Sequence, residues 1–446
     1  MRRRTFLSSS LTLSSATLFQ GCTGKTSPTE LRHSTPYLTR LAGTPPEQRF
    51  PLVYGWMKTE PLKFFAELRA ESPILKTPEC TLVALYADVL EVLRLPAVFT
   101  TQLYEPMMGD YLMAQDDTPI HTREKSIMTA VLNRNDLPSI RQLVADKAKA
   151  VLDQADGRCD FVGSLGRPVP IALTQQYFGL DGVEPAKLIE WSYWNQYEAF
   201  KNQPFDHRPE SKDIHARYKT AIVELQAYLK QLVAHRIDEI RAGVKRKDIT
   251  SRLLQASFPE SVEFPLARLA LNIGGLLIGA VETTSQATVQ ALQELIRRPD
   301  RLAEAKVYAE SGNFERFDAY VWEALRFAPI TSYIFRKTAV DYALAKGTSR
   351  ATTIPAGNTV LALVQSAMFD SNYFPSANTF DPDRPLHDLL HFGFGSHECM
   401  GKWIGMVMIP EIIRQVVLRT GLMESGDIDF DGTPFPQRYE IRWKVS

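Results

Sequence analysis

The segment 392–401 concentrates residue types that can hold a metal-bearing ligand. It reads Phe-Gly-Phe-Gly-Ser-His-Glu-Cys-Met-Gly, and an apolar pattern with helical spacing follows over 402–419. Cys399 would then stand at the mouth of a helix, where free backbone N–H groups and the macrodipole favour thiolate over thiol. Glycines at 393, 395 and 401 allow tight turns and a close approach to a flat ligand. We therefore expect a cysteine thiolate that faces a flat ligand.

A lone cysteine without a CxxC partner does not suit zinc, but it suits one axial thiolate on a haem iron. The ten residues resemble the haem-binding loop of the cytochrome P-450 superfamily, of bacterial type, whose pattern is FGxGxHxCxG. The resemblance implies haem b as the cofactor and Cys399 as the metal ligand. It also implies cofactor contacts from three more loop residues, which are Phe392, Gly393 and His397.

The pair Glu323 and Arg326 matches the ExxR motif of the same family. A spacing of three places the carboxylate and the guanidinium on one face of a helix. Alone, such a pair is typical of a solvated surface bridge worth under ~1 kcal/mol. In the family, an arginine from a later Phe-x-Pro-x-Arg segment completes the pair, and Arg384 supplies it here. The resemblance implies a buried ionic triad with a structural role.

Residues 279–284, Gly-Ala-Val-Glu-Thr-Thr, resemble the distal-helix motif of the family, with Ala280 at its second glycine. Thr283 can donate a hydrogen bond to the carbonyl four residues back, which bends the helix and opens space above the iron. Glu282 and Thr283 then form a catalytic acid–alcohol pair that can pass protons to the iron site.

Haem carries two propionates, and cations should converge on them. The segment 117–123, Asp-Thr-Pro-Ile-His-Thr-Arg, resembles the DxPxHxR segment of the family at the start of a helix. His121 and Lys125 share a face of that helix, and Lys125 stands where the family usually has arginine. Arg336 fits the position of the strand arginine that meets the other propionate, and His397 lies in the haem loop.

The elements that must position these residues are mostly helical. Apolar residues recur at helical spacing over 137–152, 214–240, 266–296 and 314–326, whereas short strand-like runs occur at 82–86, 359–363 and 439–443. The pattern predicts one mainly α domain with small β sheets. This matches the fold that the resemblance implies, with haem between a long distal helix and a proximal helix.

Composition excludes several classes of protein. The 446 residues carry 51 basic and 51 acidic side chains, so there is no strong basic field for nucleic acid. No apolar run reaches the roughly 18 residues of a membrane-spanning helix. The four cysteines, Cys22, Cys80, Cys159 and Cys399, are too scattered for a disulfide scaffold. Cys80 and Cys159 are expected to be buried free thiols, with a disulfide between them in an oxidising compartment as the alternative.

Met and aromatic residues are dense in the loop 99–113, which covers the substrate in the family. Together with Ile330, Tyr333 and Ile334 they predict an apolar, adaptable pocket for a small molecule such as a fatty acid. Trp191, Trp194 and Tyr197 form the roof of this pocket or simply pack.

The resemblance implies a monooxygenase that activates O2, hydroxylates an apolar substrate and takes electrons from a redox protein. Two other interpretations remain open at the level of sequence. One is a haem-thiolate peroxygenase or hydroperoxide isomerase, which needs no reductase. The other is a non-catalytic haem protein that senses gases or transfers electrons. An acid–alcohol pair and an apolar access loop favour the monooxygenase.

The first 22 residues resemble an export signal. Arg2, Arg3 and Arg4 precede a serine-rich apolar stretch, and Arg-Arg-Thr-Phe-Leu resembles the twin-arginine pattern. Gly21-Cys22 resembles the end of a lipoprotein signal, which makes Cys22 a lipidation site and membrane anchor. Residues 23–45 are typical of a tether before a catalytic domain over 46–446. We expect an exported, periplasmic protein, with a cytoplasmic one as the alternative.

Overall fold

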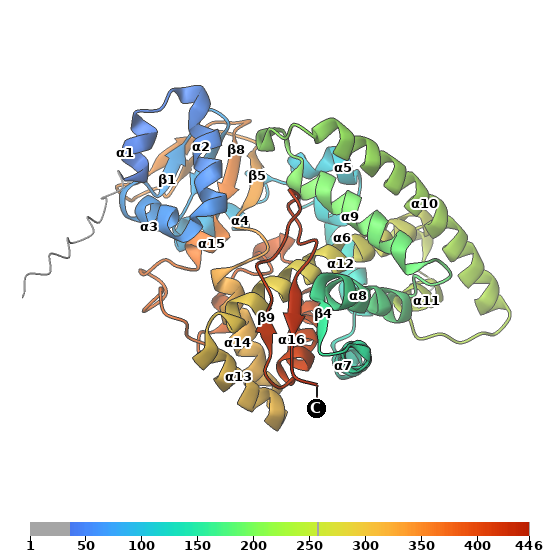
Figure 1. Ribbon diagram of the computed structural model, residues 1–446. Helices are drawn as coiled ribbons and strands as arrows, with labels where there is room; N and C mark the ends of the chain where they lie inside the picture. The colour runs from blue at the N-terminus through green and yellow to red at the C-terminus, as the bar shows by residue number, and fades with distance from the viewer. Residues whose placement is uncertain (1–35, 257, 446) are drawn as a thin grey trace, which may run out of the picture. The chain divides into compact units, whose positions relative to one another are not determined.

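Helices make up most of the computed structural model, which describes residues 36–256 and 258–445 (Figure 1). The mainly α prediction is therefore confirmed. The α-helices are α1 Tyr37–Ala42, α2 Pro46–Thr59, α3 Pro61–Glu71, α4 Tyr86–Arg94, α5 Glu105–Met108, α6 Pro119–Val131, α7 Leu137–Gln154, α8 Pro168–Leu173, α9 Pro185–Lys201, α10 Ser211–Arg241, α11 Ile249–Gln255, α12 Leu266–Ile296, α13 Pro299–Ser311, α14 Phe314–Phe327, α15 Val364–Ala367 and α16 Lys402–Val417.

The strands are short and form three small sheets. They are β1 Ile74–Lys76, β2 Cys80–Val83, β3 Phe99–Thr100, β4 Arg158–Asp160, β5 Ile334–Thr338, β6 Tyr342–Leu344, β7 Thr352–Ile354, β8 Thr359–Ala362, β9 Met423–Glu424 and β10 Glu440–Arg442. The five-stranded sheet has the order β1-β2-β8-β5-β3, in which only the pair β2–β8 is parallel. Its central strand β8 is buried along its whole length, because neighbouring strands cover both edges and side chains pack on both faces.

Helix α12 is the centre of the core. It begins and ends where the apolar pattern predicts, and α9, α10, α14 and α16 all pack on it. Figure 1 shows α9 and α10 side by side along its flank. By length and composition α12 could cross a membrane, but its many buried residues lie against these helices, as in the core of a globular protein.

Capping residues determine where the helices that carry the motif residues begin. Pro119 occupies the first turn of α6, and the Thr118 hydroxyl accepts a hydrogen bond from the His121 N–H at 3.2 Å. In the same way, Asn313 caps α14 by accepting from the Arg316 N–H at 3.2 Å. These caps set the start of the two helices and therefore the faces on which His121 and Glu323 lie.

Two boundaries differ from the sequence prediction. The run 82–86 is not one strand, because β2 ends at Val83 and Tyr86 already begins α4. Folded structure also begins before residue 46, since α1 lies within the predicted tether, and residues Tyr37–Ser446 form one compact unit. The Tyr37 ring contacts Trp56 edge-on, with ring centroids 5.1 Å apart, which anchors α1 to α2. The predicted export signal 1–22 and Cys22 lie outside the described residues.

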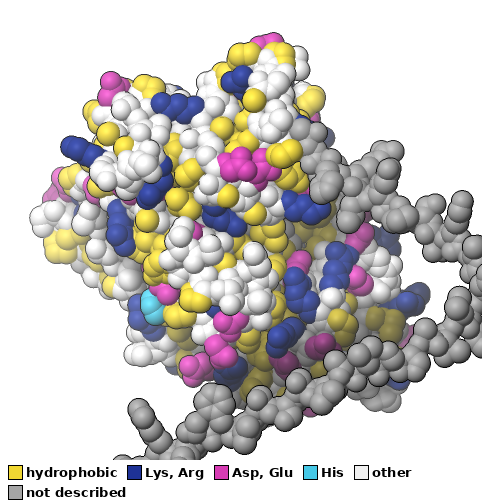
Figure 2. Space-filling view, turned by 90° about the vertical axis from the view of Figure 1, so that its left-hand side faces the viewer, with side chains coloured by type: hydrophobic (Ala, Val, Ile, Leu, Met, Phe, Trp, Pro, Cys, Tyr) yellow, Lys and Arg dark blue, Asp and Glu magenta, His cyan; other side chains and the backbone are white. Residues whose placement is uncertain are grey.

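Charges of both signs are interspersed over the face shown in Figure 2. This agrees with equal numbers of basic and acidic side chains in the sequence. Cys80 in β2 and Cys159 in β4 belong to different sheets, and both are free thiols.

Candidate active site

The loop 392–401 folds tightly because its glycines permit it. The Cys399 N–H donates to the Phe392 carbonyl at 2.8 Å, which closes the loop. Gly393 and Gly395 have φ values of +75° and +77°, in the left-handed region. A Cβ on Gly395 would also lie 2.8 Å from the Leu93 carbonyl oxygen, so that only glycine fits there. The loop thus presents Cys399 directly before the first turn of α16.

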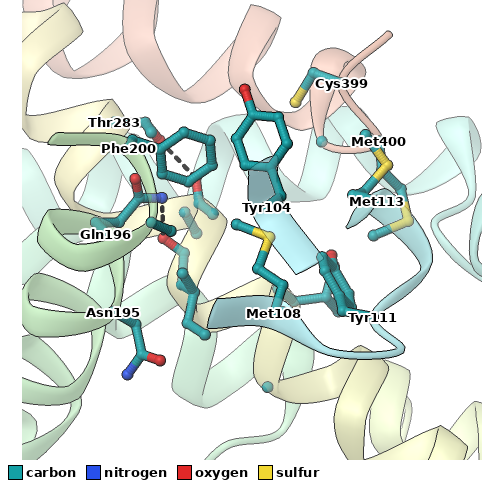
Figure 3. Close-up of a pocket in the computed structure, with 18 of the residues that line it drawn as sticks. Tyr104, Met108, Tyr111, Met113, Asn195, Gln196, Phe200, Thr283, Cys399 and Met400 are labelled. Atoms are coloured by element: carbon teal, nitrogen blue, oxygen red, sulfur yellow. Dashed lines mark hydrogen bonds between the residues drawn. The ribbon is translucent and has the colours of Figure 1, made fainter. Parts of the chain in front are cut away.

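The Cys399 side chain lines a large internal cavity (Figure 3). Burial raises the pKa of its thiol, although the Gly401 N–H and the ammonium groups of Lys125 and Lys402 lower it. The Gly401 N–H therefore acts in the direction that the helix mouth predicts, and desolvation acts against it. A bound metal ion would supply the missing charge and deprotonate the thiol.

Next to the loop, the rings of His121 and His397 are stacked, with centroids 4.6 Å apart. Nε2 of His121 and both ring nitrogens of His397 are buried without a hydrogen-bond partner among the described residues. Burial, together with the charges of Arg336 and Lys125, lowers the pKa of His397 to about 3. Unpartnered buried donors beside fixed cations are the surroundings that an anionic group such as a propionate requires.

Arg336 lies in β5, is buried and lines the same cavity. One of its Nη atoms donates to the Phe335 carbonyl at 2.8 Å, which holds the guanidinium in place. Lys125 differs from its expected role. Its ammonium donates to the carbonyls of Ser396 and Glu398, the latter at 2.9 Å, and so supports the cysteine loop instead of pointing into the cavity. The family usually has arginine at this position, and the longer arginine side chain would place its N–H donors further from helix α6 than the Lys125 ammonium.

These features fit haem b. The cysteine thiol and Phe392 line the cavity, Gly393 leaves room beside them, and unpartnered histidine nitrogens lie next to Arg336. Cys399 would hold the iron, whereas His121, His397 and Arg336 would hold the propionates.

On the distal side, Thr283 lines the cavity and its hydroxyl donates to the Gly279 carbonyl at 2.5 Å. This is the predicted hydrogen bond to the carbonyl four residues back. Gly279 and Ala280 also line the cavity, and their small side chains leave space beside Thr283. Glu282 points elsewhere, because neighbouring helical residues face different directions. Its side chain is 0% exposed and accepts two hydrogen bonds from Arg167, at 2.9 and 3.1 Å.

Arg167 was not among the predicted site residues, although it fixes the predicted acid. It precedes α8 and also donates to the Pro436 carbonyl at 3.2 Å. Burial raises the pKa of Glu282, and Arg167 lowers it. The sequence does indicate that Arg167 forms an ion pair. It is the only charged residue in the apolar run 161–173, and an arginine in such a run needs a partner. Its partner, however, lies 115 residues away.

We expect Thr283→Ala to keep haem and substrate binding but to lower product formation by about 100-fold. The hydroxyl that would deliver protons at the cavity wall is lost, so electrons supplied by a reductase should appear as hydrogen peroxide. Product and peroxide measured per NADH consumed test this. Thr288→Ala is the control, because Thr288 makes a similar 2.8 Å bond to the Thr284 carbonyl on the same helix but does not line the cavity. Equal coupling in both variants would remove Thr283 from the proton path.

The structure brings the three residues of the predicted triad together. Arg326 donates to both carboxylate oxygens of Glu323, at 2.6 and 2.9 Å, and Nε of Arg384 lies 3.5 Å from the same carboxylate. All three side chains are buried. Arg326 also donates to three backbone carbonyls, which belong to Met368, Ala377 and Thr379. The triad therefore ties α14 to the irregular chain that leads to the cysteine loop.

The cavity has a volume of about 1510 Å³ and is mostly apolar. In Figure 3, Cys399 enters it from the loop before α16, Thr283 from α12, and Met108 and Tyr111 from the predicted substrate loop. Of the predicted loop and the residues after ExxR, those that line the cavity are Tyr104, Met107, Met108, Tyr111, Met113, Ile330, Tyr333 and Ile334.

Other predicted pocket residues pack elsewhere. Phe99 and Leu112 lie fully buried in the core. Trp191 is 4% exposed, and its indole N–H donates to Glu224 at 2.9 Å. Other residues of α9 line the cavity instead, and these are Asn195, Gln196, Ala199, Phe200 and Lys201. Gln196 donates to the Ile278 carbonyl at 2.6 Å, which pins α9 to α12 above the cavity (Figure 3).

Comparison with known proteins agrees with this geometry. The model of the Cytochrome P-450 family matches residues 121–420. The chain is 27% identical to the cytochrome P-450 monooxygenase PikC of Streptomyces venezuelae over 84% of this chain and 86% of that protein. It is 25% identical to a mycinamicin IV hydroxylase/epoxidase of Micromonospora griseorubida over 81% of this chain and 89% of the other.

The fold also matches solved structures. The open form of the cytochrome P-450 Eryk from S. erythraea superimposes with a TM-score of 0.74 at 22% identity, over 87% of this chain and 97% of that one. The family model covers most of the folded unit, including the cysteine loop, the triad and α12. The chain belongs to the cytochrome P-450 family.

Proposed function

We propose that this enzyme hydroxylates a long-chain apolar substrate of the fatty-acid class. Members of its family are monooxygenases that bind haem b through a cysteine thiolate and take electrons from a redox partner. The observation that carries the proposal is the cavity, whose walls are mainly methionine, aromatic and aliphatic side chains. Such walls exclude water and adapt to a flexible hydrocarbon.

When bound, haem supplies O2 activation and C–H oxidation. The residues of this chain have separate tasks around it. Cys399 would ligate the iron and carry negative charge. Gly279 and Ala280 leave room on the distal side, and Thr283 places a hydroxyl at the cavity wall. Burial raises the pKa of Glu282, and Arg167 holds its carboxylate in place beside the distal helix.

The distal residues favour an electron-fed reaction over peroxide use. A cycle driven by O2 must receive two protons, and the Thr283 hydroxyl at the cavity wall offers a place to deliver them, whereas Arg167 holds the Glu282 carboxylate away from the cavity. A peroxide-driven reaction needs no such delivery. Two relatives, the monooxygenase PikC and the mycinamicin IV hydroxylase/epoxidase, support the same reaction type.

The test is turnover of the purified holoenzyme with dodecanoic acid, NADH and a ferredoxin–reductase pair, compared with hydrogen peroxide alone. We expect hydroxydodecanoic acids with reductase and about tenfold less product with peroxide. Under ¹⁸O2, each product molecule should carry one labelled oxygen atom. No product from dodecanoic acid, or more product with peroxide than with the reductase, would contradict the proposal.

We also propose that the protein is exported and that Cys22 attaches it to a membrane surface. The support is the twin-arginine pattern at Arg3 and Arg4 and the Gly21-Cys22 pair. A twin-arginine route carries folded proteins, which suits an enzyme that must gain haem before export. Cell fractionation together with the intact mass of the mature chain tests this proposal.

A further inference from the structure

Lys201 is a cation in the wall of an otherwise mainly apolar cavity. It is the last residue of α9 and is half-buried. Aromatic residues that line the same cavity lie around its neighbour Phe200, whose ring centroid is 5.5 Å from that of Tyr104. Tyr104 in turn stacks on Phe335 at 4.3 Å. Among the residues that the structure describes, no side chain forms a hydrogen bond or ion pair with the Lys201 ammonium.

The charged groups near Lys201 do not act as its direct partners. Asp206 attracts it, but the Asp206 carboxylate already accepts from the Tyr54 hydroxyl at 2.5 Å and from the Gln203 N–H at 2.8 Å. Arg208 and Lys58 repel it. Glu210 accepts a hydrogen bond from Arg208 at 3.2 Å and also attracts Lys58. The cluster of Lys58, Lys201, Asp206, Arg208 and Glu210 therefore contains three cations and two anions.

This surplus of positive charge is costly next to an apolar cavity. Burial, opposed by the attraction of Asp206 and aided by the repulsion from Arg208 and Lys58, lowers the pKa of Lys201 to about 8. Lys201 still carries its proton at neutral pH. An anion that enters the cavity would meet an ammonium whose three donors are free.

We propose that Lys201 binds the carboxylate of the substrate and makes the enzyme selective for acids over neutral lipids. This inference rests on the proposed function, because it assigns the polar end of the same substrate class. The ammonium would donate charge-assisted hydrogen bonds to the carboxylate, and the hydrocarbon chain would lie along the apolar wall towards the haem site. The aromatic residues beside Lys201 limit access of water, which strengthens the pair.

Calorimetric titration of the holoenzyme with dodecanoate and with methyl dodecanoate tests the assignment. In Lys201→Met we expect the affinity for dodecanoate to fall roughly 10- to 100-fold, with less than a threefold change for the ester. Lys201→Arg should keep most of the affinity for the acid. Lys58→Met is the matched control, because Lys58 belongs to the same cluster but does not line the cavity, and it should change the affinity by less than about threefold.

The pH dependence gives a second readout. Lys201 loses its charge as the pH rises through about 8, so the affinity of the wild-type protein for dodecanoate should fall above that pH. The ester should show no such fall. Lys201→Arg should keep its affinity to higher pH, since arginine stays protonated.

Equal losses for acid and ester in Lys201→Met, or a loss in Lys58→Met as large as in Lys201→Met, would overturn the assignment. The hydroxylation of dodecanoic acid would still stand, because it is measured separately. If neither the acid nor the ester binds to the wild-type holoenzyme, the assignment and the proposed substrate class both fail. The absorption spectrum of each variant verifies that haem is bound before titration.

Discussion

Arg326→Ala is expected to destabilise the protein by about 3–5 kcal/mol and to prevent stable haem binding. Removal of the guanidinium leaves the buried Glu323 carboxylate without its main partner, since Arg384 lies 3.5 Å away. It also leaves the carbonyls of Met368, Ala377 and Thr379 without their donor. Because these carbonyls lie in the chain that leads to the cysteine loop, haem retention should fall together with stability. Urea unfolding and the ratio of haem to protein absorbance measure both effects.

Arg316→Ala is the matched control for this prediction. Arg316 lies on the same helix and pairs with Asp383, but the two side chains are 34% and 72% exposed. Exposed pairs of this kind contribute about 1 kcal/mol or less. A haem-replete Arg326→Ala variant that is as stable as Arg316→Ala would show that the buried triad does not support the fold.

The sequence predicted well the features that depend only on residues close together in the chain. The spacing of apolar residues in 266–296 depends only on helix geometry, and α12 has those bounds. The bond between Thr283 and Gly279 lies within one helical turn, so residue types alone predict it. Glycine positions in the cysteine loop follow from backbone conformation, and Gly393 and Gly395 have the positive φ that makes glycine necessary.

Residues whose role depends on distant partners were harder to predict. Lys125 matches its motif position, but the loop carbonyls hold its ammonium, and nothing in its local sequence specifies that contact. The ion pair between Arg167 and Glu282 joins segments that only the tertiary fold brings together. For α9, periodicity shows that the helix is amphipathic but not which face meets the cavity. Trp191 packs in the core, whereas Gln196 and Lys201 line the cavity.

Cys399→Ser is expected to abolish the monooxygenase reaction while the protein remains folded. Serine has nearly the same size as cysteine, and the backbone bond from residue 399 to the Phe392 carbonyl does not use the side chain. The histidines and Arg336 would still surround the propionates, so some haem should bind. Without the Cys399 thiolate, bound haem would lack the ligand whose electron density promotes cleavage of the O–O bond. Turnover of dodecanoic acid should therefore fall to the background.

Cys159→Ser is the matched control, because Cys159 is a free thiol in β4, away from the cavity. It should keep both haem ligation and turnover.

The absorption spectrum of the ferrous CO complex tests most directly whether Cys399 is the thiolate ligand of haem. The wild-type protein and Cys159→Ser should show the red-shifted Soret band of thiolate-ligated haem. In Cys399→Ser that band should be absent, and the CO complex should absorb where haem without a thiolate ligand does. A red-shifted band that persists in Cys399→Ser, or that is absent from the haem-replete wild-type protein, would contradict the assignment of Cys399.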